Sequence, residues 1–130
     1  MMTAEQIMTS GIVTISPKAT LHDAIELVLD RRVSGLPVVD EDQALVGIIT
    51  EFALLALAYD EGLQHQTVQQ HMTREVITVG AGDTVNRLAD LFILHRVRRL
   101  PVIRGGRLVG LVSRRDVLKA LGQAAPVCSA

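Results

Sequence analysis

The chain has 130 residues, about the length of one domain, and with 48% hydrophobic and 21% charged residues it has the composition of a soluble globular protein. No run approaches the 18 or so apolar residues of a membrane helix, and the first ten residues, with acidic Glu5, do not resemble a secretory signal. The net charge is −1, and a single cysteine, Cys128, excludes an internal disulfide, so we expect a reducing, cytoplasmic compartment.

The charge is unevenly distributed along the chain. Residues 1–64 hold 3 basic and 10 acidic side chains, whereas residues 65–130 hold 10 basic and 4 acidic ones. Eight of the 13 basic residues fall between Arg96 and Lys119, so only the second half is well supplied with partners for an anion. Aromatic residues make up only 2% of the chain, which leaves few base-stacking platforms and argues against nucleic acid as a partner.

An internal duplication organises the sequence. Three segments recur in the same order: "IMTSGIVTIS" (7–16) as "HMTREVITVG" (71–80), "RRVSGLPVVD" (31–40) as "HRVRRLPVIR" (95–104), and "LVGIIT" (45–50) as "LVGLVS" (108–113). The offset is 64 residues before the turn that follows "LPV" and 63 after it, so one turn is a residue shorter in the second copy. Three ordered matches indicate two copies of one structural unit.

In the first copy, alternating apolar residues around Thr14 predict a short strand. Thr20 then caps a helix. Its predicted apolar face comprises Leu21, Ala24, Ile25, Val28 and Leu29. Two short apolar strands follow, at 36–39 and 45–50, and the apolar segment 51–59 predicts a closing helix.

The second copy repeats these elements. A strand is predicted around Thr78, and a helix behind Thr84. The predicted apolar face of that helix comprises Val85, Leu88, Ala89, Phe92 and Ile93. Gly105-Gly106 predicts a two-residue hairpin between the strands 100–103 and 108–113, and a closing helix follows over 114–122.

The duplication predicts an α+β fold of two tandem β-α-β-β-α repeats. We expect the first repeat over 4–60, a linker over 61–70 in which a helix could begin, the second repeat over 71–122, and a flexible tail over 123–130. A unit of about 60 residues has a weak core by itself. The two repeats should therefore pack sheet against sheet about a pseudo-twofold axis, which creates two related clefts for a ligand.

These repeated segments resemble the cystathionine-β-synthase (CBS) domain family. The resemblance runs over about residues 4–122, through "RVSGLPVVDE" and "LVGIIT" and again through "RVRRLPV" and "LVGLVSRRD". It implies a CBS pair, or Bateman module, that commonly forms a homodimer shaped as a flat disc. It also implies an adenosine-containing ligand (AMP, ADP, ATP, an NAD-type dinucleotide or S-adenosylmethionine) and a regulated partner protein. With no catalytic domain in the sequence, the resemblance suggests a stand-alone sensor that is no enzyme and requires no cofactor besides this ligand.

The resemblance also implies the site residues. The family's ligand motif (Gly, apolar, any, Ser/Thr, two residues, Asp) is matched by residues 110–116, where Asp116 would accept the ribose hydroxyls and Ser113 would add a hydrogen bond. The adjoining helix start favours a phosphate. The implied nucleotide site comprises Val13, Thr14, Ile15, Ser34, Gly35, Arg98, Arg99, Leu111, Val112, Ser113, Arg115 and Asp116.

The first copy departs from this motif. Ala53 stands where the motif has Asp, and Glu51 places a like charge where a phosphate would lie. Losing a charged acceptor costs roughly 1.5–3 kcal/mol per hydrogen bond. The second cleft should therefore bind a nucleotide weakly or not at all. Its residues would be Ile48, Thr50, Ile77 and Thr78.

Simpler interpretations stay open. Ser113 and Asp116 also form the capping-box pattern, worth about 1 kcal/mol to a helix. Arg98 and Arg99 could be solvated surface or pair with the acidic half. The four histidines have no metal-ligand spacing, so no metal site is predicted, and no catalytic set is recognisable. The alternative function is a ligand-free dimerisation or protein-interaction domain, in which the oppositely charged halves of two chains meet head to tail.

Overall fold

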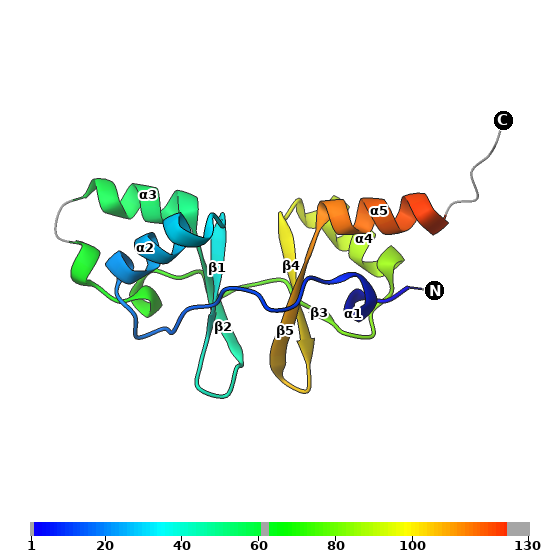
Figure 1. The fold of residues 1–130 in the computed structure, drawn as a ribbon, viewed down its shortest axis with the longest axis horizontal. Helices are drawn as coiled ribbons and strands as arrows, with labels where there is room; N and C mark the ends of the chain where they lie inside the picture. The colour runs from blue at the N-terminus through cyan, green and yellow to red at the C-terminus, as the bar shows by residue number, and fades with distance from the viewer. Residues whose placement is uncertain (1, 61–62, 125–130) are drawn as a thin grey trace. The chain divides into compact units, whose positions relative to one another are not determined.

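The computed structural model describes residues 2–60 and 63–124 (Figure 1). The first copy contains α2 (Leu21–Arg31), β1 (Gly35–Val39), β2 (Leu45–Thr50) and α3 (Glu51–Tyr59). The second contains β3 (Val79–Gly80), α4 (Val85–His95), β4 (Arg99–Arg104), β5 (Arg107–Ser113) and α5 (Arg114–Ala124). Shorter elements are α1 (Ala4–Ile7) and the 3₁₀ turns η1 (Leu63–His65) and η2 (Val68–Gln70). The predicted α+β class and the duplication are confirmed.

The chain forms two compact units whose boundaries do not coincide with the duplication. The Asp116 unit takes its described residues from the segments Met1–Ile12 and Ile77–Ala130. The Ala53 unit consists of Val13–Val76. Each copy's first few residues thus belong to the unit built on the other copy.

The two hairpins have matching registers. β1 pairs antiparallel with β2, with Leu36 opposite Ile49, and β4 pairs with β5, with Leu100 opposite Val112. Both glycines of the Gly105-Gly106 turn have positive φ (58° and 77°), and Arg104 is paired with Arg107, so the predicted two-residue hairpin is confirmed.

The strands predicted to open each copy are much shorter than expected. β3 is only two residues long and pairs in parallel with β4, whereas residues 13–15 form no strand but a single parallel bridge between Ile15 and Val38. Ile15 donates to the Pro37 carbonyl and accepts from Val39, both at 3.0 Å. The preceding bond of such a ladder, to the Val13 carbonyl, would need an amide hydrogen on Pro37, and the equivalent residue in the second copy is Pro101. Proline has no such hydrogen, so neither ladder begins earlier.

The helix caps follow the prediction. The Asp23 amide donates to the Thr20 hydroxyl at 3.1 Å, and the Arg87 amide donates to the Thr84 hydroxyl at 3.3 Å. α2 and α4 end in the same way as well, since both C-cap residues, Arg32 and Arg96, have φ of 54°.

Each unit has its own hydrophobic core. The fully buried side chains include Leu36, Val38 and Ile49 in the Ala53 unit, and Leu88, Leu100, Val102 and Val112 in the Asp116 unit. Two residues predicted to be in the apolar helix faces are instead exposed: Leu29 at 70% and Ile93 at 77%. They occupy equivalent positions in the two copies, at the edge of the apolar helix face, and the buried part of that face is too narrow to include them. In α4, Leu91 is buried, although it was not predicted to be in the apolar face.

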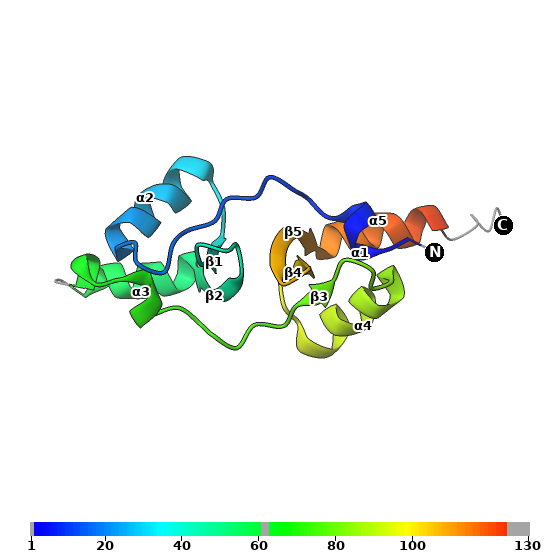
Figure 2. The same cartoon turned by 90° about the horizontal axis from the view of Figure 1, so that it is seen from below.

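The N-terminal segment completes the Asp116 unit. Ala4 is fully buried, and its amide donates to the Asp83 carbonyl at 2.8 Å. Thr9 and Leu111 exchange main-chain hydrogen bonds of 2.9 and 3.0 Å at the edge of β5. Figures 1 and 2 show α1 beside α5 from both directions. This short helix was not predicted.

The predicted linker contributes to the core of the Ala53 unit. Val68 is fully buried and its amide donates to the Ala19 carbonyl at 2.8 Å. The expected start of a helix is realised only as the turns η1 and η2. At the other end, α5 continues through the first two residues of the predicted tail, while residues 125–130, with Cys128, lie outside the described part. No helix in the described ranges has the length and hydropathy that a membrane crossing requires.

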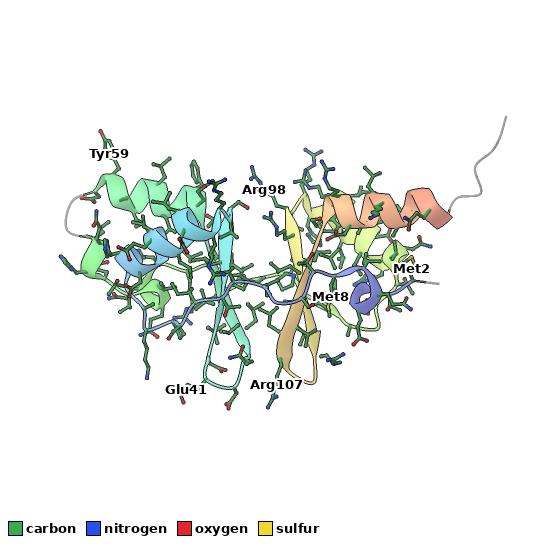
Figure 3. All side chains as sticks on the ribbon, viewed as in Figure 1. Met2, Met8, Glu41, Tyr59, Arg98 and Arg107 are labelled. Carbon is green, nitrogen blue, oxygen red and sulfur yellow. The ribbon has the colours of Figure 1, made fainter. Side chains whose placement is uncertain are left out.

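Two glycines let a second chain segment approach the sheets closely. A Cβ on Gly110 would lie 2.9 Å from the Thr9 carbonyl oxygen, and the Met8 side chain lies against the same position of β5 (Figure 3). A Cβ on Gly47 would lie 2.8 Å from the Thr73 carbonyl oxygen and equally close to Met72. Main-chain oxygens held in hydrogen bonds cannot move away without moving their segment.

We predict that Gly110→Ala and Gly47→Ala each lower the free energy of unfolding by about 1–3 kcal/mol, the usual effect of overpacking. Urea denaturation measures the change. Gly82→Ala is the matched control because nothing lies within 4 Å of its Cβ position. Equal stability of the Gly110→Ala and Gly82→Ala variants would show that the segment carrying Thr9 is not held closely against β5.

Candidate functional site

The candidate site is centred on the junction between β5 and α5. β5 ends at Ser113 and α5 begins at the next residue, without a loop. The Ser113 amide donates to Oδ2 of Asp116 at 2.8 Å, and the Asp116 amide donates to Oγ of Ser113 at 3.2 Å. This is a complete capping box, and both side chains are half-buried. The structural interpretation of the Ser-x-x-Asp motif is therefore correct.

The capping box uses only part of the hydrogen-bonding capacity of the Asp116 carboxylate. An ionised carboxylate has two oxygens and about four acceptor positions, of which the amide of Ser113 occupies one on Oδ2. The cap also fixes the carboxylate at the first turn of an 11-residue helix. A group held there could accept hydrogen bonds from two neighbouring hydroxyls without rearrangement.

The equivalent junction in the Ala53 unit is simpler. β2 ends at Thr50, whose hydroxyl accepts a hydrogen bond from the Ala53 amide at 3.1 Å. This single bond is half of a capping box, because Ala53 has no side-chain acceptor to return it. Glu51, the first residue of α3, is exposed and places a carboxylate at the helix start. The two junctions therefore share their backbone but differ in the charge they present.

Arg114 has a positioning role that the sequence did not reveal. Its Nε donates to the Val97 carbonyl at 3.0 Å and its Nη2 to the Arg96 carbonyl at 3.4 Å. These carbonyls follow the last turn of α4, so the guanidinium ties the start of α5 to the end of α4. A comparison of the two copies could have indicated this role, because Glu51 occupies the equivalent position in the first copy and cannot donate such hydrogen bonds.

Three other arginines lie near the junction in the chain. Arg99 is paired with Ser113 across the hairpin, so it begins β4 at the level where β5 ends. Arg98 precedes it and extends from that end of β4 (Figure 3). Arg115 is in the first turn of α5, and all three are exposed. The hairpin register thus brings predicted phosphate-binding residues to the same end of the sheet as Asp116.

The two apolar residues of the motif have different environments. Val112 is fully buried in the core of the Asp116 unit, so its side chain is not accessible to a ligand. Leu111 is half-buried, is paired with Pro101, and its main chain bonds Thr9. The sequence analysis placed both residues in the nucleotide site and did not predict this difference in burial.

The remaining predicted residues belong to the Ala53 unit. Ile15 is buried in that unit's core, while Val13 and Thr14 are half-buried. The Ser34 carbonyl accepts a hydrogen bond from the Glu51 amide at 2.9 Å, and Gly35 is paired with Thr50. Ser34 and Gly35 thus occupy in this unit the positions that Arg98 and Arg99 occupy in the other.

The residues predicted for the weaker cleft are also divided. Ile48 and Thr50 lie in the Ala53 unit, where Ile48 exchanges main-chain hydrogen bonds with Thr73. Ile77 and Thr78 lie in the Asp116 unit, just before β3, and Thr78 is exposed. Each of the two predicted sites therefore has some of its residues in the Asp116 unit and the others in the Ala53 unit. That the two groups meet around one ligand stays a prediction.

The histidines have other contacts. His22 lies 3.0 Å from Glu26 on the surface of α2, and His71 lies 2.5 Å from the Gln66 side chain. Within residues 2–60 and 63–124 there is no group of three or more His, Cys, Asp or Glu side chains placed to hold a metal ion.

Comparison with known proteins identifies relatives along almost the whole chain. The family model described as "CBS domain" matches twice, at residues 4–60 and 68–123. CBSX2, solved as a crystal structure in complex with AMP, matches with a TM-score of 0.83 and 31% identity over 93% of this chain and 96% of that one. A further crystal structure of CBSX2, from Arabidopsis thaliana, matches with the same TM-score and 29% identity, over 93% of this chain and 94% of that one.

Two curated relatives come from Methanocaldococcus jannaschii. An uncharacterized protein is 32% identical over 90% of this chain and 42% of its own length. An inosine-5'-monophosphate dehydrogenase is 32% identical over 89% of this chain but only 23% of its own length. The chain therefore spans less than half of these curated relatives.

We predict that Asp116→Ala lowers the free energy of unfolding by about 1 kcal/mol in ligand-free protein, because it removes the acceptor for the Ser113 amide. Asp116→Asn keeps an acceptor oxygen and should lose less. Urea denaturation of the three proteins measures the difference. An Asp116→Ala variant as stable as the wild type would mean that the cap contributes nothing to folding.

Proposed function

The chain belongs to the CBS domain family, and from that membership we propose that it is a regulatory module that binds one adenine nucleotide at the Asp116 junction. The observation that carries the proposal is the half-buried Asp116 carboxylate, fixed at the start of α5 beside a cluster of arginines. Binding would change the shape of the module or its affinity for a partner protein, which it thereby regulates. A CBS pair is typically non-catalytic, and no chemical step is proposed.

The ribose is the part of the ligand that Asp116 recognises. Its carboxylate accepts hydrogen bonds from the 2′ and 3′ hydroxyls, which a deoxyribose or a bare phosphate cannot supply together. Ser113 adds a contact at the same end of the helix. Because the capping bond already restrains the carboxylate, little side-chain entropy is lost on binding.

The phosphates are recognised by positive charge. The N-terminus of α5 offers main-chain amides and the positive end of the helix dipole. Arg98, Arg99 and Arg115 supply guanidinium groups. Arg114 serves the site indirectly, because its bonds to the carbonyls of Arg96 and Val97 hold α5 in place.

The adenine is recognised by apolar side chains and main-chain groups. Leu111 offers a half-buried side chain, whereas Val112 is fully buried and supports the strand from the core. Val13, Thr14, Ile15, Ser34 and Gly35 of the Ala53 unit complete the proposed site. AMP in the crystal structure of CBSX2 supports this ligand class, since that protein matches 93% of this chain.

One site per chain is proposed, because the junction at Ala53 lacks the ribose acceptor. Ile48, Thr50, Ile77 and Thr78 would form the second site, but Glu51 repels a phosphate there. The regulated protein, a separate chain or a further part of the same one, is not identified by these residues.

An alternative function is a dimerisation or protein-interaction domain that binds no ligand. The observation that favours it is a set of exposed apolar side chains on the helices, among them Phe52 at 79% and Tyr59 at 90%. Exposed apolar clusters commonly mark protein-binding surfaces. A homodimer is compatible with both functions.

We predict that the protein binds at least one of AMP, ADP, ATP, NADH and S-adenosylmethionine with about one ligand per chain in isothermal titration calorimetry. A ligand at 100 times its Kd should stabilise the fold by about 2.7 kcal/mol in a thermal-shift assay. Absence of heat from all five at near-millimolar concentration would favour the ligand-free alternative.

The role of Asp116 has a sharper test. Asp116→Ala should raise the Kd for AMP at least about tenfold, because charged hydrogen bonds of about 1.5–3 kcal/mol each are lost. The wild type should bind 2′-deoxy-AMP more weakly than AMP, whereas the Asp116→Ala variant should bind both alike. If the variant still prefers AMP, the ribose is recognised elsewhere.

The asymmetry between the junctions is also testable. We predict that Ala53→Asp combined with Glu51→Arg raises the stoichiometry toward two nucleotides per chain, because it gives the Ala53 junction the charges of the other. Glu51→Arg alone is the control and should leave one ligand per chain. Unchanged stoichiometry in the double variant would mean that features other than these two positions close this junction.

A further inference from the structure

Positive charge gathers around the end of α4 and the start of α5. Arg96, Arg98 and Arg99 fall within four consecutive residues, and Arg114 and Arg115 begin α5. All five side chains are exposed. Neighbouring like charges repel one another, so such a group is unfavourable unless an anion binds to it or some of its members have another role. The hydrogen bonds of Arg114 give it such a role.

Arg114 binds the part of the chain that follows α4. Its Nε donates to the Val97 carbonyl at 3.0 Å and its Nη2 to the Arg96 carbonyl at 3.4 Å. Arg96 is the C-cap of α4, where carbonyls have no partner within the helix and carry the negative end of its dipole. Two donors on one planar guanidinium restrain two successive peptide groups at once. The side chain therefore fastens the loop 96–98, which joins α4 to β4.

The same loop is held from the other side by the hydrophobic core. Val97 is half-buried and its side chain packs against the core of the Asp116 unit, while its carbonyl accepts the hydrogen bond from Arg114. Arg98 is the next residue, and it lies outside β4, which begins at Arg99. The main chain of Arg99 is placed by its pairing with Ser113 in the sheet. The main chain of Arg98 is instead placed by the loop, and hence by what holds the loop.

The fold does not require the Arg114 side chain. The equivalent residue in the Ala53 unit is Glu51, whose ionised side chain has no donor. α2 nevertheless ends as α4 does, with φ of 54° at its C-cap Arg32. The loop there is bonded through the main chain, since the Glu51 amide donates to the Ser34 carbonyl at 2.9 Å. The guanidinium of Arg114 therefore adds a restraint that the shared backbone does not need, which indicates a role in binding.

We propose that Arg114 is a positioning residue for phosphate recognition: it holds the loop 96–98 so that the Arg98 guanidinium stays where the phosphate of the nucleotide binds. The inference rests on the proposed nucleotide site and deepens it. Arg114 serves the phosphate alone, because the ribose acceptor Asp116 is held by its own hydrogen bond from the Ser113 amide. Loss of the Arg114 side chain should therefore weaken binding of a nucleotide and leave binding of the nucleoside unchanged.

Isothermal titration calorimetry with AMP and adenosine tests this selectivity, because adenosine has the same base and ribose but no phosphate. Arg114→Met keeps an unbranched side chain and removes its donors. We expect it to raise the Kd for AMP about tenfold and to change the Kd for adenosine less than about twofold. Arg114→Lys keeps the charge but not the planar pair of donors, so its Kd for AMP should lie between those of the wild type and Arg114→Met.

Arg107→Met is the matched control. Figure 3 shows Arg107 and Arg98 at opposite ends of the β4–β5 hairpin, and Arg107 is an exposed residue paired with Arg104 beside the turn. The substitution removes the same charge, so we expect both affinities to stay within about twofold of the wild type. An equal loss of AMP affinity in Arg107→Met would mean that net charge, and not the tie to the loop, sets the affinity. Urea denaturation checks that both Met variants keep the wild-type fold.

A double-mutant cycle with Arg98→Ala tests the route of the effect. If Arg114 acts through Arg98, Arg114→Met should raise the Kd for AMP less than about twofold in the Arg98→Ala background. A full tenfold effect in that background, about 1.4 kcal/mol, would mean that Arg114 contacts the phosphate itself, and the positioning role would be wrong. Equal losses of AMP and adenosine affinity in Arg114→Met would also overturn it, because the whole junction would then depend on this side chain.

The proposed function and this inference fail in different ways. Wild-type protein that binds neither AMP nor adenosine at near-millimolar concentration contradicts the nucleotide site, and the inference with it. A wild type that binds AMP, with an unchanged Kd in Arg114→Met, contradicts only the role of Arg114. The double-mutant cycle uses AMP alone, so it decides this role even where adenosine binds too weakly to measure.

Discussion

The exchanged main-chain hydrogen bonds between Thr9 and Leu111 are the contact on which the Asp116 unit depends. They fasten a segment of the first copy along the edge of β5, where Gly110 leaves room for it. Ile48 and Thr73 make the equivalent bonds in the Ala53 unit, beside Gly47. Each unit includes a short segment from the other copy, the one that carries Thr9 in the Asp116 unit and the one that carries Thr73 in the Ala53 unit. Neither copy therefore contains all the residues of one folded unit. The pairing of the two copies is thus built into the folding of each.

The same edge strands lead directly into the helices that carry the candidate site. With no loop between β5 and α5, the sheet register fixes where the helix starts, and the capping box fixes Asp116 at its first turn. Arg114 adds a connection to the end of α4. Folding and the proposed ligand recognition therefore share residues: the cap that stabilises α5 also orients the carboxylate proposed to bind the ribose. The two interpretations of Ser113 and Asp116 do not compete.

Duplication produced two similar backbones with different surfaces. At the junctions, Asp116 and Arg114 correspond to Ala53 and Glu51 in the other copy, so the two helix starts present different charges. On the helices, equivalent apolar positions persist while the charges have opposite signs. Divergence of the charges, with the backbone and the apolar pattern retained, leaves one of the two junctions as the proposed nucleotide site.

The sequence determined the duplication, because a repeat is visible in the order of the residues alone. It also determined the caps at Thr20 and Thr84 and the Gly105-Gly106 hairpin, because each depends on residues close together in the chain, and these repeated elements gave the α+β class. Tertiary structure decided what local patterns do not contain. Pro37 and Pro101 directly precede the residues paired in parallel, Val38 and Val102, and prevent the ladders from beginning earlier because they have no amide hydrogen to donate. Leu29 and Ile93 follow the apolar period of their helices yet face outward, because burial depends on what packs against a helix face. The exchange of segments between the copies likewise depends on contacts between distant residues, Thr9 with Leu111 and Ile48 with Thr73, which no local pattern records.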